Sequence, residues 1–379
     1  MKRLLLLGGG HAHAVVLRGL VGAPLSDTRV TLVTPHDLHT YSGMLPGLVA
    51  GHYTVDDVQF DLAGLARAAG AELVPDSAAG LDLALGVAEL EDGRRIAYDI
   101  VSLNLGSAPN TSRAPGAAKY SLPAKPFERF LEGWYAMLAQ DASQVPTISL
   151  VGAGAAGVEL AMAIRHRFMI LGREVRVVLY SEKPSFAAPL MQRIAGALQR
   201  SGVELRADTV VEAVERGETG PVLVVRGERE PCDAVIWTAG AAPLPWFAAS
   251  GLATDEHGFV LVDETLRSTS HPAVFAVGDC ATLRDARHPK SGVFAVRHGN
   301  ALARNLRCAV EGRNLARYAP QKQVLALISC GARYAIADWG GLAAEGEWVW
   351  RWKDWLDRRW VQGFKSGDGS GSEEPAEGG

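Results

Sequence analysis

The sequence lacks the features that identify several classes of protein. Its 379 residues include only four cysteines, with no C-x-x-C pair and no zinc-type spacing, so we expect free thiols in a cytoplasmic chain. No apolar run approaches the length of a membrane span. The formal net charge of −4 provides no basic field, and nucleic acid is therefore not an expected partner.

What the sequence does contain is glycine at the ends of apolar strands. Residues 147–151 are apolar and precede Gly152-x-Gly154-x-x-Gly157, after which an alanine-rich helix is expected. In this dinucleotide fingerprint the first glycine allows a tight turn, the second lets the backbone approach a pyrophosphate, and the third lets helix and strand pack closely. The pyrophosphate would lie at the helix N-terminus, where free N–H groups and the helix dipole favour negative charge.

An earlier copy of the same plan follows residues 3–7 and is less regular. Gly8 and Gly10 are in place, but His13 stands at the third glycine position. The acid expected after the next strand is replaced by Thr34, whose hydroxyl bonds a ribose less strongly than a carboxylate would. This copy alone therefore predicts a nucleotide site less firmly than the second copy does.

Histidines near the first copy raise the alternative of a metal site. His11 and His13 lie in the glycine turn, and His36 and His39 follow the next strand. We expect no metal here, because a nucleotide should occupy this turn. His11 is instead predicted to contact that nucleotide.

Further strands end in glycine turns of the same kind. Gly106 and Gly240 each end a buried strand and are followed shortly by proline, so one nucleotide-binding plan occurs twice. Gly278-Asp279 ends a third strand, and an aspartate there can accept hydrogen bonds from a polyol such as the ribityl chain of FAD. A helix expected over residues 293–311 could direct its N-terminus at the flavin ring and stabilise negative charge on it.

These motifs together resemble a known family. The segments GGGHAHAVVL, YDIVSLNLGSAP, VGAGAAGVELA, CDAVIWTAGAAP and AVFAVGDCA resemble the flavoproteins with two dinucleotide-binding domains. The segments YSGMLPGLVAGHY and LISCGARYA…WVWRWKDWLDRRW resemble type II NADH dehydrogenases of the pyridine nucleotide-disulfide oxidoreductase superfamily. They resemble still more closely the flavoprotein found fused to selenide, water dikinase. The resemblance covers residues 1–364, and no dikinase region is present.

The resemblance implies that the first copy holds FAD and the second holds NAD(P)H. It places Glu159, on the second fingerprint helix, near both redox rings as the candidate catalytic residue, although Glu159 could equally be an acid favoured at a helix start. The YSGMLPG loop would line the flavin. The predicted cofactor-binding residues are Gly8, Gly10, His11, Thr34, Ser42, Gly43, Gly106, Gly152, Gly154, Gly157, Gly240, Gly278 and Asp279.

The choice between NADH and NADPH stays open at this point. The strand over residues 174–180 is followed by Ser181, Glu182 and Lys183. An acid at this place favours NADH and a basic residue favours NADPH, and the sequence offers both.

The expected fold is α/β, with two Rossmann-like domains of which the first is discontinuous. Residues 1–120 and 255–320 are predicted to form the FAD-binding domain, and residues 121–254 the NAD(P)H-binding domain. Residues 321–365 should form a C-terminal segment. Residues 366–379 contain only small, polar, charged and proline residues and are predicted to be a disordered tail.

The C-terminal segment contains a tryptophan-rich stretch over residues 348–364. At helical spacing, one side carries Trp348, Val349, Trp352, Trp355, Leu356 and Trp360, and the other carries Lys353, Asp354, Asp357 and Arg358. Tryptophan flanked by basic residues suits peripheral contact with a membrane, here its inner face. A helix that packs on a core or forms a homodimer would show the same pattern.

The predicted function is transfer of hydride from NAD(P)H to FAD, followed by release of electrons to a second acceptor, for which a quinone is the first choice. One alternative is a soluble flavin reductase linked to selenium or sulfur metabolism. Another is an FAD-binding redox sensor or assembly protein without turnover. A cysteine-based disulfide reductase is not expected, because residues 40–45, where many such enzymes carry their cysteine pair, contain none.

Overall fold

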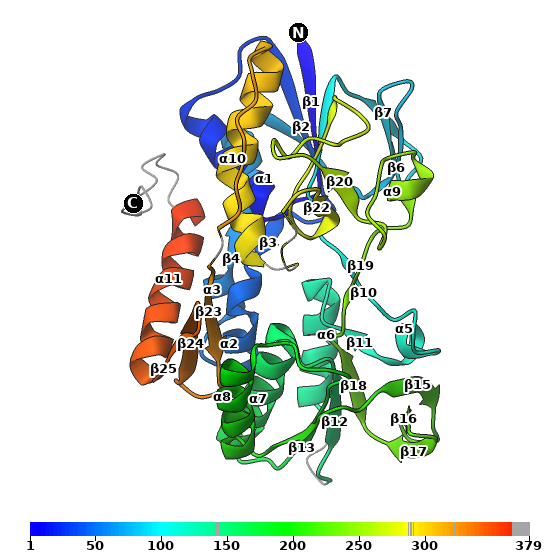
Figure 1. The fold of residues 1–379 in the computed structure, drawn as a ribbon, viewed down its shortest axis with the longest axis vertical. Helices are drawn as coiled ribbons and strands as arrows, with labels where there is room; N and C mark the ends of the chain where they lie inside the picture. The colour runs from blue at the N-terminus through cyan, green and yellow to red at the C-terminus, as the bar shows by residue number, and fades with distance from the viewer. Residues whose placement is uncertain (141–143, 287, 289, 291, 322, 366–379) are drawn as a thin grey trace.

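The computed structural model describes residues 1–140, 144–286, 288, 290, 292–321 and 323–365. The chain forms two five-stranded sheets, one above the other in Figure 1. The first contains, in spatial order, β21 (Val274–Ala276), β9 (Ile100–Leu103), β1 (Lys2–Leu7), β2 (Thr28–Val33) and β5 (Ala71–Val74), and all neighbouring pairs are parallel. The chain therefore leaves this sheet after β9 and returns to it only at β21.

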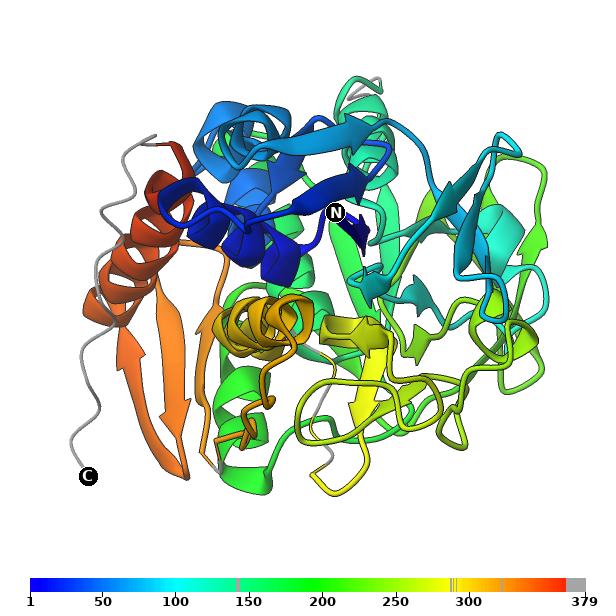
Figure 2. The same cartoon turned by 90° about the horizontal axis from the view of Figure 1, so that it is seen from above.

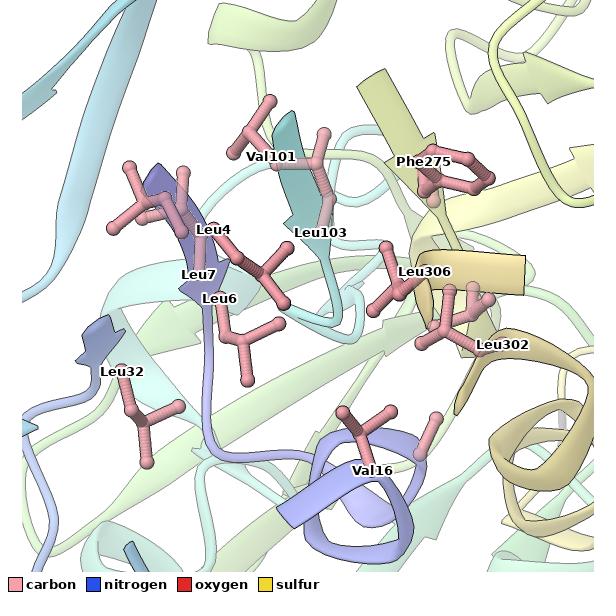
Figure 3. Packing of buried hydrophobic residues seen from close by; sticks show 14 of the residues in the cluster. Leu4, Leu6, Leu7, Val16, Leu32, Val101, Leu103, Phe275, Leu302 and Leu306 are labelled. Carbon is pink, nitrogen blue, oxygen red and sulfur yellow. The ribbon is translucent and has the colours of Figure 1, made fainter. Parts of the chain in front are cut away.

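The four consecutive leucines of β1 are almost completely buried. This is the expected pattern for a central parallel strand, which is covered on both faces. In Figure 3, Val16 of α1 (His11–Gly22) and Leu302 and Leu306 of α10 (Gly292–Glu311) lie toward these leucines. The first core thus joins segments that lie almost 300 residues apart in the sequence.

The second sheet repeats the plan. Its order is β11 (Leu122–Pro123), β18 (Ala234–Trp237), β12 (Thr147–Val151), β13 (Arg176–Tyr180) and β14 (Val203–Arg206), again with all pairs parallel. The accompanying helices are α6 (Phe127–Leu138), α7 (Ala155–Ile170) and α8 (Ala188–Arg200). The predicted α/β fold with two Rossmann-like sheets is confirmed.

Small elements fill the connections. Three-stranded antiparallel sheets are formed by β6 (Ala78–Asp82), β7 (Val87–Leu90) and β8 (Arg95–Ala97), and by β15 (Val211–Arg216), β16 (Pro221–Val225) and β17 (Glu228–Pro231). Strand pairs are β3 (Leu38–Thr40) with β4 (Gln59–Asp61), β10 (Ala108–Pro109) with β19 (Ala241–Ala242), and β20 (Val260–Val262) with β22 (Ala281–Leu283). Short helices are η1 (Ser42–Met44), α2 (Leu45–Ala50), α3 (Val55–Val58), α4 (Leu62–Ala68), α5 (Ala117–Tyr120), α9 (Trp246–Ala249) and η2 (Gly278–Cys280).

The C-terminal segment is an antiparallel sheet followed by a long helix, side by side in Figure 2. The sheet consists of β23 (Leu325–Ser329), β24 (Ala335–Trp339) and β25 (Leu342–Gly346), and the helix is α11 (Glu347–Lys365). Among the described residues, no helix is both long and apolar enough to cross a membrane. The predicted tail, residues 366–379, lies outside the described residues.

The two sides of α11 that polarity distinguishes do not coincide with the sides that are buried and exposed in the structure. Lys353 and Asp357, assigned to the polar side, are buried, whereas Trp348 and Trp355 are more than half exposed. A helical wheel ranks side chains by polarity and assumes that a polar side faces water. Here the buried charges pair with each other and with the rest of the protein, which satisfies them inside.

We propose the domain limits given by the sequence, with one refinement. Phe247 of α9 and Leu252 pack in the core of the first sheet, ahead of the predicted return at residue 255. The short pair β10–β19 joins the two crossings of the chain between the sheets. The return to the first domain is therefore best placed directly after β19.

Candidate functional site

The first glycine loop is closed by Asn104, the residue after β9. A side chain at Gly8 (φ +95°) would place its Cβ 2.4 Å from the Asn104 carbonyl oxygen, and one at Gly10 would lie 2.4 Å from Asn104 Oδ1. Asn104 Oδ1 accepts hydrogen bonds from the N–H groups of Ala12 (3.1 Å) and His13 (3.3 Å). Both glycines are thus required by the approach of β9 to the start of α1.

His13 accounts for the missing third glycine. Its Nδ1 donates to the Gly8 carbonyl at 2.6 Å, and its Nε2 accepts from the Ser102 hydroxyl at 2.9 Å. Burial lowers the pKa of His13 to about 4, so the ring is neutral at pH 7, as this pattern of one donor and one acceptor requires. Thr34 is buried at the end of β2, where its Oγ1 accepts from the His36 N–H at 3.5 Å.

The second loop is closed mainly by backbone atoms. A Cβ at Gly152 (φ +107°) would lie 2.6 Å from Ala239 Cα, and one at Gly157 would lie 1.8 Å from the Gly152 carbonyl oxygen. Gly154 differs, because a Cβ there would meet nothing within 4 Å. The protein itself does not require glycine at 154, so the open space in front of it fits a pyrophosphate at the N-terminus of α7.

Gly106 and Gly240 end β9 and β18 through equivalent turns. A Cβ at Gly106 would meet nothing within 4 Å, whereas one at Gly240 would lie 3.0 Å from Asn110 Cβ. The two glycines stand one or two residues before the paired strands β10 and β19. Gly106 and Gly240 therefore occupy corresponding places where the chain crosses between the domains.

Gly278 and Asp279 follow β21 and adjoin the first loop. The Gly278 N–H donates to His298 Nδ1 at 3.1 Å, and Asp279 Oδ2 pairs with Lys125 Nζ at 2.9 Å. Asp279 Oδ1 is buried and has no hydrogen-bond partner. A buried acceptor without a donor is costly, and a ligand hydroxyl would satisfy it. This orphaned oxygen is the feature of the first domain that best fits the ribityl chain of FAD.

The YSGMLPG loop brings the first glycine loop into contact with α11. Ser42 Oγ lies 3.3 Å from His11 Nε2, and the Gly43 carbonyl accepts from Lys353 Nζ at 2.8 Å. The ring of Tyr41 stacks on Trp360 with 4.3 Å between centroids, and the His11 ring lies 5.2 Å from Trp360. The predicted residues His11, Ser42 and Gly43 are thus held at one place.

Glu159 lies in the same place, although it comes from the second domain. Its Oε1 accepts from the Ser329 N–H at 2.8 Å, so the second fingerprint helix contacts the C-terminal sheet. Lys353 Nζ, which reaches Gly43, also pairs with Asp357 at 2.6 Å in a buried i,i+4 ion pair. We call Tyr41, Glu159, Lys353 and Asp357 the charged cluster.

Burial and mutual charge shift the pKa values within the charged cluster. Burial raises the pKa of Glu159 to about 7, although Lys353 and the Ser329 N–H act in the opposite direction. Burial also raises the pKa of Tyr41, and Asp357 adds to that effect. For Lys353, burial acts to lower the pKa, but Asp357 and Glu159 raise it on balance. The cluster therefore contains one group, Glu159, that exchanges a proton near neutral pH.

The surroundings of the four cysteines do not favour thiol chemistry. All four are buried, and burial raises the pKa of Cys330 to about 12 and raises the pKa of Cys280 as well. A reactive thiol needs an accessible site and a lowered pKa. Among the described residues, no group of three or more His, Cys, Asp or Glu side chains could hold a metal ion.

Several residues of the site were not recognised from the sequence. Lys125 and His298 were not among the predicted site residues, and Lys353 and Asp357 were noted only as part of the polar side of the C-terminal helix. Asn104 carried no signal beyond its place at the end of a strand. The sequence signal available for Lys353 and Asp357 was their opposite charge at i,i+4 spacing on a tryptophan-rich helix, which allows the two side chains to pair.

Several known proteins are similar to this chain in sequence. Residues 2–299 match the family model described as pyridine nucleotide-disulphide oxidoreductase. The chain is 27% identical to the alternative NAD(P)H-ubiquinone oxidoreductase C1 of Arabidopsis thaliana over 83% of its length and 68% of that protein. It is 24% identical to the type II NADH:quinone oxidoreductase of Staphylococcus saprophyticus, covering 82% of this chain and 83% of that protein.

The solved structures show likeness of fold. The sulfide:quinone oxidoreductase of Aquifex aeolicus superposes with a TM-score of 0.82 at 17% identity, over 98% of this chain and 93% of that one. At this identity the match shows a shared fold, and it carries no conclusion about substrate.

Proposed function

Because the chain belongs to the pyridine nucleotide-disulphide oxidoreductase family, we propose that it is an FAD-dependent NAD(P)H dehydrogenase that passes electrons to a quinone. One observation carries the proposal. The charged cluster joins the second fingerprint helix, the YSGMLPG loop and α11 at a single place. Parts that would hold the nicotinamide, the flavin and the acceptor are therefore brought together there. The curated relatives named above act on NADH or NAD(P)H and on quinones.

The first domain fits FAD through the residues predicted for it. Gly8, Gly10 and His11 would face its pyrophosphate at the start of α1, Thr34 its ribose, and the unpaired Asp279 Oδ1 its ribityl hydroxyls. When bound, FAD would supply the redox chemistry, accepting hydride from the nicotinamide and releasing electrons to the acceptor.

The chain's own residues position the partners and manage protons. The buried ion pair Lys353–Asp357 fixes the position of a cation at the Gly43 carbonyl. Glu159, with a pKa of about 7, would hold or release a proton at its Oε atoms as the acceptor takes up charge. Reduction of a quinone to a quinol consumes two protons, so a titrating carboxyl here serves the reaction.

The test is anaerobic stopped-flow absorbance of the FAD-reconstituted protein, mixed first with NADH or NADPH and then with a soluble quinone. We expect fast bleaching of the flavin band by a nucleotide and its return on adding quinone. Bound FAD that no nucleotide bleaches would overturn the proposal and favour a redox sensor or assembly protein.

A second acceptor class follows from the resemblance to the flavoprotein fused to selenide, water dikinase. It would make the chain a soluble flavin reductase linked to selenium or sulfur chemistry. The same reduced protein distinguishes the two, because flavin reoxidised by a selenium or sulfur species and not by quinone would replace the quinone proposal. The buried, high-pKa cysteines speak against a cysteine-based route to such an acceptor.

We also propose that α11 makes peripheral contact with the inner face of a membrane. Trp348, Trp352 and Trp355 have 58%, 37% and 53% of their surface exposed and follow one face of the helix, with Arg351 and Arg359 beside them. Indole rings with adjacent cations suit the headgroup region of an anionic bilayer.

Flotation with anionic vesicles tests this contact. Replacing Trp348, Trp352 and Trp355 by serine should release the protein from the vesicles, whereas the control Tyr135→Ser, an exposed aromatic on α6, should not. Solution mass measured by light scattering provides the alternative: a dimer that the triple variant converts to a monomer, without vesicle binding, would assign the face to self-association.

A further inference from the structure

A group of polar atoms without partners lies beside α10, outside the charged cluster. In the described part of the chain, seven buried side-chain nitrogen or oxygen atoms lack a hydrogen-bond partner. Three of them belong to residues that lie together, namely Arg297 Nη1, His298 Nε2 and Tyr318 Oη. Buried polar groups are normally satisfied, so orphaned atoms gathered at one place indicate a partner that the protein itself does not supply.

The chain that follows α10 brings Tyr318 to this place. It turns back along the helix, where the Asn305 side chain bonds the backbone of the returning segment at 2.9 and 2.8 Å. The Tyr318 N–H donates to the Glu264 carbonyl at 2.6 Å, and its ring meets that of His298 edge on, with 4.9 Å between centroids. Burial raises the pKa of Tyr318 and the charge of Arg297 acts against that rise, because the guanidinium lies near the ring.

All three orphaned atoms can donate a hydrogen bond. The Gly278 N–H donates to His298 Nδ1 at 3.1 Å, so the ring proton stands on Nε2. Burial lowers the pKa of His298 to about 3, which keeps the ring neutral at pH 7. Guanidinium nitrogens only donate, and the Tyr318 hydroxyl can turn its proton toward a ligand. A ligand that satisfies all three must therefore offer acceptor atoms.

The charge at this place is also unbalanced. Among the residues that the structure describes, no carboxylate pairs with Arg297. Acids on the adjoining segments pair elsewhere, Glu264 with Arg317 at 3.2 Å and Asp279 with Lys125 at 2.9 Å. A water molecule can satisfy a hydroxyl or an imidazole, but a guanidinium with a buried nitrogen also requires negative charge. The missing partner is therefore an anion.

Arg297 points away from the glycine loop of the first domain. The helix α10 faces α1 through Gly299, where an added Cβ would lie 2.7 Å from Val15 Cβ. Arg297 stands two residues earlier, about 200° around the helix, and therefore projects from the opposite side. Arg297 and Tyr318 are each half-buried, so a ligand reaches them from the surface without opening the core. FAD at the first loop thus leaves these atoms unexplained.

We propose that Arg297, His298 and Tyr318 bind a small oxyanion of the phosphate type, at a site distinct from both dinucleotide loops. Arg297 supplies the positive charge, and its planar fork matches two oxygens of such an anion. The His298 Nε2–H and the Tyr318 hydroxyl donate to the remaining oxygens. Because His298 also holds the Gly278 N–H, an occupied site would stiffen the turn that carries Asp279.

Calorimetric titration of the FAD-loaded protein with inorganic phosphate tests the proposal. NAD⁺ is present throughout, so that phosphate does not register at the second glycine loop. We expect one phosphate per chain in the wild type, roughly tenfold weaker binding in Arg297→Gln and weaker binding in Tyr318→Phe. Arg304→Gln is the matched control, an exposed arginine two turns further along α10, and should bind phosphate as the wild type does.

Thermal unfolding gives a second readout with a definite sign. Without added anion, Arg297→Gln should melt at or above the temperature of the wild type, because it removes an unpaired and partly buried charge. Phosphate should raise the melting temperature of the wild type and of Arg304→Gln and leave that of Arg297→Gln unchanged. Sodium chloride at equal ionic strength should not reproduce this rise.

Three results would overturn the proposal: no heat of phosphate binding, equal phosphate affinity in Arg297→Gln and Arg304→Gln, or a response to chloride that equals the response to phosphate. Neither measurement involves hydride transfer. The inference and the proposed function can therefore fail separately.

Discussion

The two glycine loops have nearly the same backbone and differ in how they are closed. Gly10 and Gly154, the residues just before α1 and α7, have φ values of −73° and −72°. At the third fingerprint position, however, the first loop carries His13 and the second carries Gly157. His13 returns a hydrogen bond to the loop, whereas at Gly157 even a methyl group would collide with it. A glycine can thus be replaced where the larger residue bonds to the backbone that it approaches.

The residue after the strand that flanks each loop also bonds to that loop in a different way. In the first copy, the Asn104 side chain bonds two N–H groups of the first turn of α1. In the second copy, Thr238 Oγ1 donates to the carbonyls of Val151 and Gly152 instead. The first loop is therefore stabilised mainly by side chains and the second by backbone contact, and the two should respond differently to substitution.

The largest effect is expected from Gly157→Ala. The added Cβ would lie 1.8 Å from the Gly152 carbonyl oxygen, so the loop or α7 must move. We expect a loss of about 4 kcal/mol in the free energy of unfolding and no measurable bleaching of the flavin by NADH. Chemical denaturation and stopped-flow absorbance measure the two.

Gly154→Ala is the control for that substitution. Its Cβ would meet no protein atom within 4 Å, so stability should stay near that of the wild type while the KM for the nucleotide rises. Equal loss of stability in both variants would contradict the view that backbone contact closes the second loop at Gly157 and not at Gly154.

His13→Gly restores the regular fingerprint and should nevertheless weaken the protein. It removes a fully buried ring and its hydrogen bonds to Gly8 and Ser102. We expect a loss of about 3 kcal/mol in the free energy of unfolding, together with weaker FAD binding, measured by denaturation and by flavin fluorescence.

Ser102→Ala removes only the partner of His13 Nε2 and should cost less, about 1 kcal/mol. If His13→Gly instead matched the wild type in both stability and FAD affinity, the first loop would be closed by the backbone, as the second is. The two loops would then not differ in how they are closed.

The sequence was informative where local chemistry determines structure. Glycine followed by helix at the end of an apolar strand predicted both Rossmann-like sheets, because the tight turn and the close approach restrict the residue type. The same pattern singled out Gly278-Asp279. The roles of Asn104 and Lys125 were not recoverable, because their partners Ala12, His13 and Asp279 lie 91 to 154 residues away in sequence.

The orientation of α11 could not be read from the sequence, for a different physical reason. Polarity alone assigns Lys353 and Asp357 to solvent, but a charged pair can be buried when each member satisfies the other and a third group, here the Gly43 carbonyl. The three tryptophans then occupy the exposed face. A pattern of amphipathicity locates a helix and its two faces, and it does not determine which face the protein covers.

A further effect, which depends on pH, concerns the second helical turn, where the two copies again differ. The first copy has Val15, which packs against Gly299 of α10, and the second has Glu159 at the equivalent place. The folded-state pKa of Glu159, about 7, lies above its ordinary value of 4.5, so protonation favours folding. Its stabilising contribution is complete below pH 4.5 and is lost as the pH rises through 7.

Glu159→Gln keeps a neutral side chain at every pH and should separate ionisation from packing. In protein freed of cofactor, the variant should match the wild type near pH 4 and exceed its free energy of unfolding by about 1–2 kcal/mol at pH 8, since partial exposure reduces the full effect of the shift. Denaturation curves across this range measure the difference. A gain in the free energy of unfolding of the same size at both pH values would mean that Glu159 destabilises the fold through its packing. The second copy would then differ from the first in packing rather than in charge.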